Sequence, residues 1–314
     1  MPRGHTRVRR SPARTAALTP ERLWAVLNAA VAGWWNDNVP RMGAALAYYT
    51  FFSLAPIFIV AIAIAGLAFG EEAVRGEIVG QIEGLVGHDG AQAVQAMLEG
   101  AAKPSSSILA TILGVITFFL GATGAFLELQ VDLDAIWRVK PKSRGSFLRD
   151  LLMQRLISFG LVLGFAFLLL TSLVVSAALA AAHRYMGNAF PGVAVLWEAV
   201  NVVVSLGVIT LLFAMIFKVL PDVKLGWSDV WVGALVTAGL FTIGKFLIGL
   251  YLGTSTFAST YGAAGSVIVI LVWVYYTSQL ILLGAEFTRA YVEQFGPRPP
   301  PVEFATKDPK PRVS

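Results

Sequence analysis

Lys245 is the residue whose position in the sequence most strongly suggests chemistry. It is the sole charged residue between Val230 and Ala285, about 15 residues, or roughly 22 Å of helical rise, into an apolar segment of membrane-spanning length. A lysine at that depth costs about 2.5–3.5 kcal/mol on insertion scales, and such residues usually face a bundle interior or a cavity. We expect the Lys245 ammonium to face the bundle and hold an anion. The alternative is a side chain that snorkels to the outer interface.

A second group of polar residues lies on one face of the last apolar segment. Tyr275, Gln279 and Glu286 follow the spacing i, i+4, i+11, which places them on the same side of a helix. Glu128 has a similar depth in an earlier apolar segment, and Arg289 closes the last one. These charges predict a cluster at the cytoplasmic helix ends that binds a headgroup or ion or relays protons. We favour the alternative, a structural set of ion pairs, since buried pairs often fix an arrangement.

The first apolar segment contains two further candidates. Pro56, with Ser53 one turn earlier, predicts a kink in a spanning helix. Tyr48 precedes it among several aromatic residues and is a candidate for the polar network. Simple packing is the plainer interpretation of these aromatic side chains.

Signatures of enzymatic chemistry are absent from the sequence. The chain has no cysteine and three widely separated histidines, His5, His88 and His183. It contains no zinc-protease, nucleophile-elbow, Walker or dinucleotide-binding motif. Asp132 and Asp134 diverge at their spacing on a helix, so they predict a metal site only weakly. We therefore expect no catalytic residues, no metal site and no cofactor.

The elements that position these residues follow from composition. Hydrophobic residues make up 56% of the 314 residues and charged residues only 14%, against about 25% charged residues in soluble domains. So few charges cannot cover a water-facing surface, which excludes a soluble globular protein and bulk disorder.

The apolar runs predict an all-α polytopic membrane protein with a bundle of six transmembrane helices. A helix needs about 20 apolar residues to cross a bilayer. The 56-residue run from Val230 suits two spans, with its Gly/Ser/Thr-rich stretch at 253–262 as the turn. The expected spans are 44–70, 105–128, 156–182, 195–218, 230–252 and 263–287.

The distribution of Lys and Arg predicts the orientation. Twenty of them fall in the two termini and the second and fourth connections, and three fall in the other connections. Lysine and arginine accumulate on the cytoplasmic side. Both termini are therefore expected in the cytoplasm of a multi-pass protein of the bacterial cytoplasmic (inner) membrane.

Four segments flank or connect the spans. Residues 1–18 are expected to be a disordered basic tail. A helix over 20–36, with Thr19 and Pro20 at its start, is expected to lie in the cytoplasmic interface at the headgroup depth of its tryptophans. The external segment 71–103 is expected to form two short helices, a hairpin broken at Gly87–Gly90. The Pro-rich cytoplasmic tail 296–314 is expected to be extended or disordered.

Several longer stretches resemble the YihY/BrkB family of bacterial inner-membrane proteins. They are AALAYYTFFSLAPIF, DAIWRVKPKSRGSFLRD, KVLPDVKLGWSDVWVGAL, KFLIGLY and TYGAAGSVIVILVWVYYTSQLILLGAEFTRAY. The resemblance covers about residues 20–295. The positions that match the family pattern are Tyr48, Ser53, Pro56, Trp137, Pro221, Lys245, Tyr261, Gly262 and Glu286.

The resemblance implies a six-helix membrane protein without established catalytic residues, although members have carried the label ribonuclease BN. The leading hypothesis is transport or translocation of a lipid or amphipathic anion in envelope maintenance. The alternatives are a non-transporting envelope scaffold and, less favoured, a membrane-bound ribonuclease. The expected partners are membrane lipids and a lipid-linked or anionic substrate, with self-association left open. No nucleic acid is expected.

Overall fold

The chain is largely helical. The computed structural model describes residues 19–102, 124–141, 160, 193–254, 263–296, 299–302 and 305–307. Its helices are α1 (Pro20–Asn36), α2 (Val39–Phe69), α3 (Glu71–Ala102), a helix over 124–136, α6 (Val193–Val219), α7 (Trp227–Thr254) and α9 (Ala263–Phe295), and its strands are β1 (Val139–Pro141) and β2 (Ala305–Lys307).

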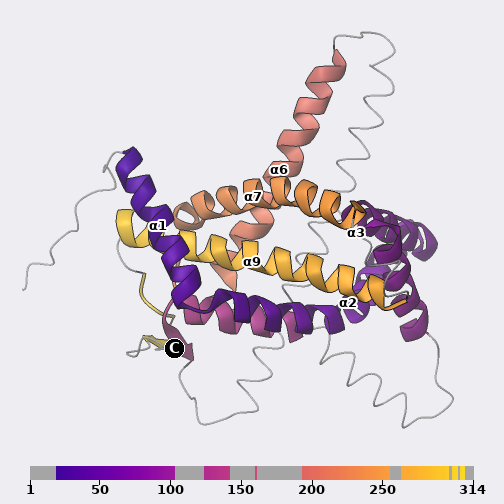
Figure 1. Ribbon diagram of the computed structural model, residues 1–314, viewed down its shortest axis with the longest axis horizontal. Coiled ribbons are helices and arrows are strands. Elements are labelled where there is room, and N and C mark those ends of the chain that lie inside the picture. Colours follow the sequence, from indigo (N-terminus) through magenta and orange to yellow (C-terminus); the bar gives the residue numbers. More distant parts are fainter. Residues whose placement is uncertain are drawn as a thin grey trace, which may run out of the picture.

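Helix α9 is the central element of this arrangement. It packs against α1, α2, α3 and α7, and Figure 1 shows it running between α7 and α2, with α1 near one of its ends and α3 near the other. A helix surrounded on several sides must be apolar over most of its surface. The sequence of α9 meets this requirement until its last turns, where Glu286 and Arg289 appear.

Helices α7 and α9 approach each other closely through glycine. A Cβ at Gly233 of α7 would lie 1.8 Å from the Thr288 hydroxyl of α9, and one at Gly284 of α9 would lie 1.9 Å from the Thr237 hydroxyl of α7. Both threonine hydroxyls donate to a carbonyl one turn earlier on their own helices, at 2.7 Å. Small residues therefore set the distance between these two helices, as in membrane helix pairs.

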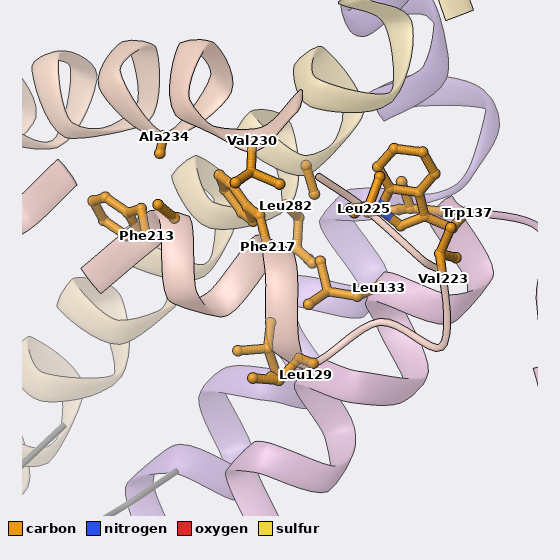
Figure 2. Packing of buried hydrophobic residues seen from close by; sticks show 14 of the residues in the cluster. Leu129, Leu133, Trp137, Phe213, Phe217, Val223, Leu225, Val230, Ala234 and Leu282 are labelled. Carbon is orange, nitrogen blue, oxygen red and sulfur yellow. The ribbon is translucent and has the colours of Figure 1, made fainter. Parts of the chain in front are cut away.

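The largest apolar cluster lies between helix 124–136, α6, α7 and α9. Figure 2 shows Leu129 and Leu133 beside Phe217 of α6, Val230 of α7 and Leu282 of α9. Residues from distant parts of the sequence thus share one apolar core. This core holds together the helices at the end of the molecule where the charged residues lie.

Three helices of the described residues are long and apolar enough to cross a membrane, over Val202–Val219, Trp227–Ile248 and Val267–Phe295. They correspond to the predicted spans 195–218, 230–252 and 263–287, and the last helix extends further than predicted. The predicted span 44–70 is covered by α2 together with its C-cap residue, Gly70. The predicted span 156–182 and most of 105–128 lie outside the described residues.

The flanking segments confirm one prediction and contradict another. Helix α1 has the predicted bounds, with Thr19 as its N-cap residue and Pro20 in the first turn. The predicted break at Gly87–Gly90 is wrong, because α3 is helical from Glu71 to Ala102. Val74 and Leu98, near its two ends, belong to one apolar cluster with Ile62 of α2 and Ile270 of α9. This packing outweighs the local helix-breaking tendency of glycine.

The described residues 299–302 and 305–307, in the tail that the sequence predicts to be extended or disordered, are extended and docked. β2 pairs antiparallel with β1, with Val139 opposite Lys307. Val223 forms a bridge with Pro301, and the Val302 amide donates to the Asp222 carbonyl at 3.1 Å. The C-terminal segment therefore joins the connection after helix 124–136 to the α6–α7 connection.

Candidate functional site

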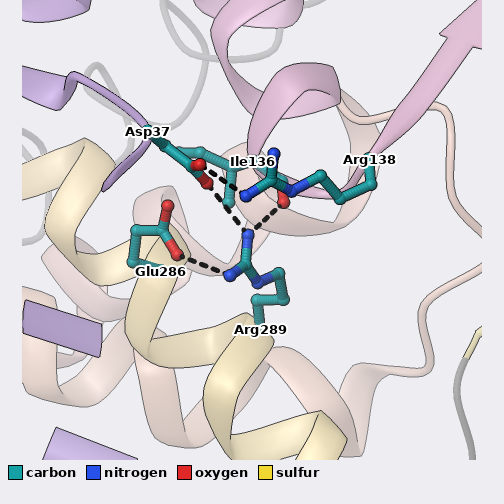
Figure 3. Close-up of polar contacts among 5 residues, drawn as sticks. All are labelled: Asp37, Ile136, Arg138, Glu286 and Arg289. Atoms are coloured by element: carbon teal, nitrogen blue, oxygen red, sulfur yellow. Dashed lines mark hydrogen bonds and ion pairs between the residues drawn. The ribbon is translucent and has the colours of Figure 1, made fainter. Parts of the chain in front are cut away.

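Four charged side chains from three separate segments meet beside the last turns of α9. Figure 3 shows Asp37, from the turn between α1 and α2, facing Arg138, Glu286 and Arg289. Arg138 pairs with one Asp37 oxygen, and Arg289 Nη1 lies 3.1 Å from the other. Arg289 Nη2 lies 3.5 Å from Glu286 Oε2. We call these four residues the charged cluster.

The charged cluster is shielded from solvent to different degrees. Only 1% of Glu286 is exposed, while the side chains of Arg289 and Arg138 are 16% and 36% exposed. Arg289 also donates to the Ile136 carbonyl at 2.6 Å. Arg289 therefore links α9, the α1–α2 turn and the end of helix 124–136.

Two left-handed residues aim the side chains into the charged cluster. Asn38 (φ 56°) follows Asp37 and reverses the chain between α1 and α2, and Arg138 itself has φ 55°. Such backbone conformations are uncommon for residues other than glycine. They orient two side chains that regular helices would direct elsewhere.

Helix α1 covers the charged cluster through a glycine. A Cβ at Gly33 would lie 2.4 Å from Glu286 Oε2, so the α1 backbone lies directly against the carboxylate. Val26 and Ala30 of the same helix pack with Phe287 and Ala290 of α9. The opposite side of α1 exposes Leu23, Trp24, Leu27, Val31 and Trp35.

Gln279 extends the polar face of α9 by two turns from Glu286. Its Oε1 accepts a hydrogen bond from Trp34 Nε1 at 3.1 Å, and its Nε2 donates to the Val39 carbonyl at 3.4 Å. Tyr275, further along the same face, is exposed. The predicted face therefore exists, and its burial increases from Tyr275 toward Glu286.

The remaining predicted residues lie elsewhere. Lys245 is exposed on α7, and two of the predicted bundle helices lie largely outside the described residues, so its placement toward the bundle stays a prediction. Tyr48 is exposed on α2 beside Tyr49 and Phe52. Glu128 is half-buried on helix 124–136, and among the described residues it forms no hydrogen bond or ion pair with the charged cluster. Pro56 lies within α2, and its kink stays a prediction.

A pair of carboxyl groups lies between helix 124–136 and the α6–α7 connection, beyond the predicted end of the second span. The Asp222 amide donates to Asp134 Oδ1 at 2.7 Å, and Gln130 Nε2 lies 3.4 Å from Asp222 Oδ1. Burial, helped by the nearby Asp222 charge and opposed by the Asp222 amide, raises the pKa of Asp134 to about 8. Burial also raises the pKa of Asp222. These groups favour a protonated Asp134 at neutral pH.

The sequence interpretation predicted Glu286 and Arg289 together but missed Asp37 and Arg138. One feature of the sequence could have identified Asp37: it is an acidic residue between the predicted interfacial helix 20–36 and the first predicted span. Arg138 was interpreted only as one of many cytoplasmic basic residues. No group of three or more His, Asp or Glu side chains within the described part of the chain is arranged to hold a metal ion.

The arrangement can act in two ways. It can join three segments by ion pairs, or it can exchange a proton or an ion, because Glu286 is buried beside both a second carboxyl group and a guanidinium group. Both roles depend on Arg289, which contacts Asp37, Glu286 and the Ile136 carbonyl.

Comparison with known proteins places these features in a family of membrane proteins. The chain is 27% identical over 252 residues to a UPF0761 membrane protein of Ralstonia nicotianae, and 30% identical over 275 residues to one of Rhodospirillum centenum. These matches cover 80% and 85% of this chain but 55% and 57% of the relatives, so the chain spans little more than half their length.

A third relative is closer in length. The UPF0761 membrane protein of Pseudoalteromonas translucida is 26% identical over 267 residues, which cover 82% of this chain and 85% of the relative. No solved structure matches the chain. The family model described as virulence factor BrkB matches residues 30–307, a range that includes all four residues of the charged cluster, and the chain therefore belongs to the BrkB family of membrane proteins.

Proposed function

We propose that this protein moves a lipid or an amphipathic anion across the bacterial cytoplasmic membrane in envelope maintenance. The observation that carries the proposal is the charged cluster beside the end of α9, a helix of membrane-spanning length. Ionisable groups within spanning segments are expensive and usually serve a substrate or ion pathway. Two arginines in this cluster match the phosphate or carboxylate of such a substrate.

The proposed topology has six spans and both termini in the cytoplasm. Contacts support it, because the four segments predicted to be cytoplasmic meet at one end of the molecule. Asp37 contacts Arg138 and Arg289, Asp222 contacts Asp134, and β1 pairs with β2. Helix α3, predicted to be external, lies near the other end of α9 (Figure 1).

Cysteine labelling tests this topology directly, since the chain has no native cysteine. Thr306→Cys in β2 and Glu77→Cys in α3 are both at exposed positions. An impermeant maleimide applied to intact spheroplasts should label only Glu77→Cys, and lysis should make Thr306→Cys reactive. Labelling of Thr306→Cys in intact spheroplasts would contradict the topology.

The transport proposal is tested in proteoliposomes that contain a fluorescent anionic phospholipid. A membrane-impermeant quencher reports how fast the lipid changes leaflet. The wild-type chain should accelerate this exchange, and Arg138→Gln should reduce it because Arg138 is the most exposed cation of the charged cluster. Arg41→Gln removes an equivalent charge from exposed α2 surface and is the control. Equal rates with and without protein would reject lipid movement.

The alternative function is an envelope scaffold that transports nothing. The same ion pairs favour it. Asp37 pairs with both arginines, so the two guanidinium groups already have a partner within the protein. A scaffold would leave lipid exchange unchanged while capturing the same protein partners with and without Arg138→Gln. We propose no catalytic activity.

A further inference from the structure

We propose that Glu286 carries one exchangeable proton beside Asp37, and that its loss changes how Arg289 divides between the two carboxylates. The proton site stands on the geometry of the charged cluster alone. Its use as the coupling ion of transport rests on the proposed function.

Glu286 is the first part of the argument. Only 1% of the residue is exposed, and neither carboxylate oxygen has a hydrogen-bond partner among the described residues. Its nearest cation, Arg289 Nη2, is 3.5 Å away, beyond a normal charge-assisted hydrogen bond. An ionised carboxylate in such surroundings is strongly disfavoured, and a bound proton removes that cost.

Asp37 is the second part. It holds both guanidinium groups, one on each oxygen, and therefore takes the positive charge that Glu286 lacks. The two acids are close enough to interact electrostatically, and Figure 3 shows the Glu286 carboxyl directed toward Asp37. A carboxylate this close to Asp37 is disfavoured in its ionised form, so Glu286 keeps its proton.

Within the described residues, the charged groups around Glu286 come from three segments. Asp37 comes from the α1–α2 turn, Arg138 from the end of helix 124–136, and Arg289 from α9 itself. Helix α1 contributes the uncharged backbone at Gly33. Two cations thus face two acids, and a proton on the pair leaves one net positive charge for an anion.

Loss of the proton has a defined structural effect. An ionised Glu286 would compete with Asp37 for Arg289, whose Nη1 also binds the Ile136 carbonyl. Movement of Arg289 toward Glu286 weakens its bonds to the α1–α2 turn and to helix 124–136. The proton therefore controls how firmly three segments are joined at this end of the molecule.

Infrared difference spectroscopy of the full chain in detergent tests the site. A protonated carboxyl group has a carbonyl band that shifts in deuterated buffer. The double variant Asp134→Asn/Asp222→Asn is used as the background, because burial raises the pKa of both of these acids. In this background we expect one such band at neutral pH, which disappears at alkaline pH.

Variants assign the band to the pair. Glu286→Gln should remove it at neutral pH because the carboxyl group is gone. Asp37→Asn should also remove it, because the guanidinium groups that Asp37 holds can then pair with an ionised Glu286. Glu293→Gln, on the exposed surface of the same helix, should leave it unchanged. A band that persists in either of the first two variants overturns the proposed site. If Glu286→Gln does not fold, Asp37→Asn gives the test from the other side of the pair.

Proton flux in proteoliposomes separates this inference from the proposed function. A band assigned to the pair without proton movement during lipid exchange leaves the site intact and rejects its coupling role. Lipid exchange without the band rejects the site and leaves the transport proposal standing.

Discussion

Gly33 of α1 lies directly against the carboxylate of Glu286 on α9. A Cβ at Gly33 would be 2.4 Å from Oε2 and 2.8 Å from the carboxyl carbon. The contact joins two helices that are far apart in the sequence, at the most deeply buried charge of the described residues. It makes the size of residue 33 a determinant of the charged cluster.

Gly33→Ala should therefore destabilise the protein. Alanine is better than glycine in a helix by about 1 kcal/mol, so helix propensity alone predicts the opposite sign. Here the added methyl group must displace a buried carboxyl group. The midpoint of thermal unfolding in detergent should fall, whereas Gly76→Ala, on exposed α3 surface with no neighbour within 4 Å, should raise it slightly. A higher midpoint for Gly33→Ala would show that α1 is loosely packed.

The two arginines of the charged cluster should differ in their effect on stability. Arg289→Gln leaves Asp37 and Glu286 without their shared buried cation, and breaking a buried pair costs about 3–5 kcal/mol. Arg138 is more exposed, and Arg138→Gln should cost about 1 kcal/mol or less. Denaturant unfolding followed by tryptophan fluorescence measures both. Equal losses would mean that burial does not govern the energetics of these pairs.

Asp134 should make stability depend on pH. Its pKa is raised from an ordinary value of 3.8 to about 8 in the folded protein. The folded state therefore binds the proton more tightly than the unfolded state, so this stabilisation is complete below about pH 4 and is lost as pH rises through about 8.

Asp134→Asn should flatten that dependence, because asparagine stays neutral and its Oδ1 can still accept from the Asp222 amide. We expect the wild type to unfold at a lower temperature at about pH 9 than at about pH 6, with a smaller difference in Asp134→Asn. Glu293→Gln serves as the exposed control and should retain the wild-type difference. An unchanged profile in Asp134→Asn would assign the effect to another group.

The α7–α9 contact provides a prediction with an internal rescue. Gly233→Ala introduces a methyl group whose carbon lies 1.8 Å from the Thr288 hydroxyl, so the helices must separate and the thermal midpoint should fall. Thr288→Ala removes the hydroxyl, and the double variant should recover part of the loss. Additive losses in the double variant would show that the two positions are not coupled.

Much of the helical framework was predictable from the sequence because membrane-spanning helices depend on long apolar runs. The bounds of α1 and the last three spans follow from such runs and from local capping residues. The direction of Lys245 cannot be predicted from the sequence of α7, because this helix is apolar around its whole circumference and does not indicate which face is covered.

The charged cluster was predictable only in part. Glu286 and Arg289 stand out because they interrupt an apolar helix. Asp37 and Arg138 do not, since their directions depend on left-handed backbone at Asn38 and Arg138. The docking of β2 on β1 joins residues far apart in sequence, and a Pro-rich composition carries no sign of such a partner. Glycines at 87 and 90 suggested a break that the packing of α3 overrides.

The pairing of β1 with β2 also has a consequence for biogenesis. β1 emerges from the ribosome long before β2, and in the described part of the chain three helices of membrane-spanning length lie between them in the sequence. β1 therefore has no strand partner until β2 has been translated. Pairing of the two strands, together with the Val223–Pro301 bridge, joins three segments of the chain, so a copy that is truncated before residue 299 lacks these connections.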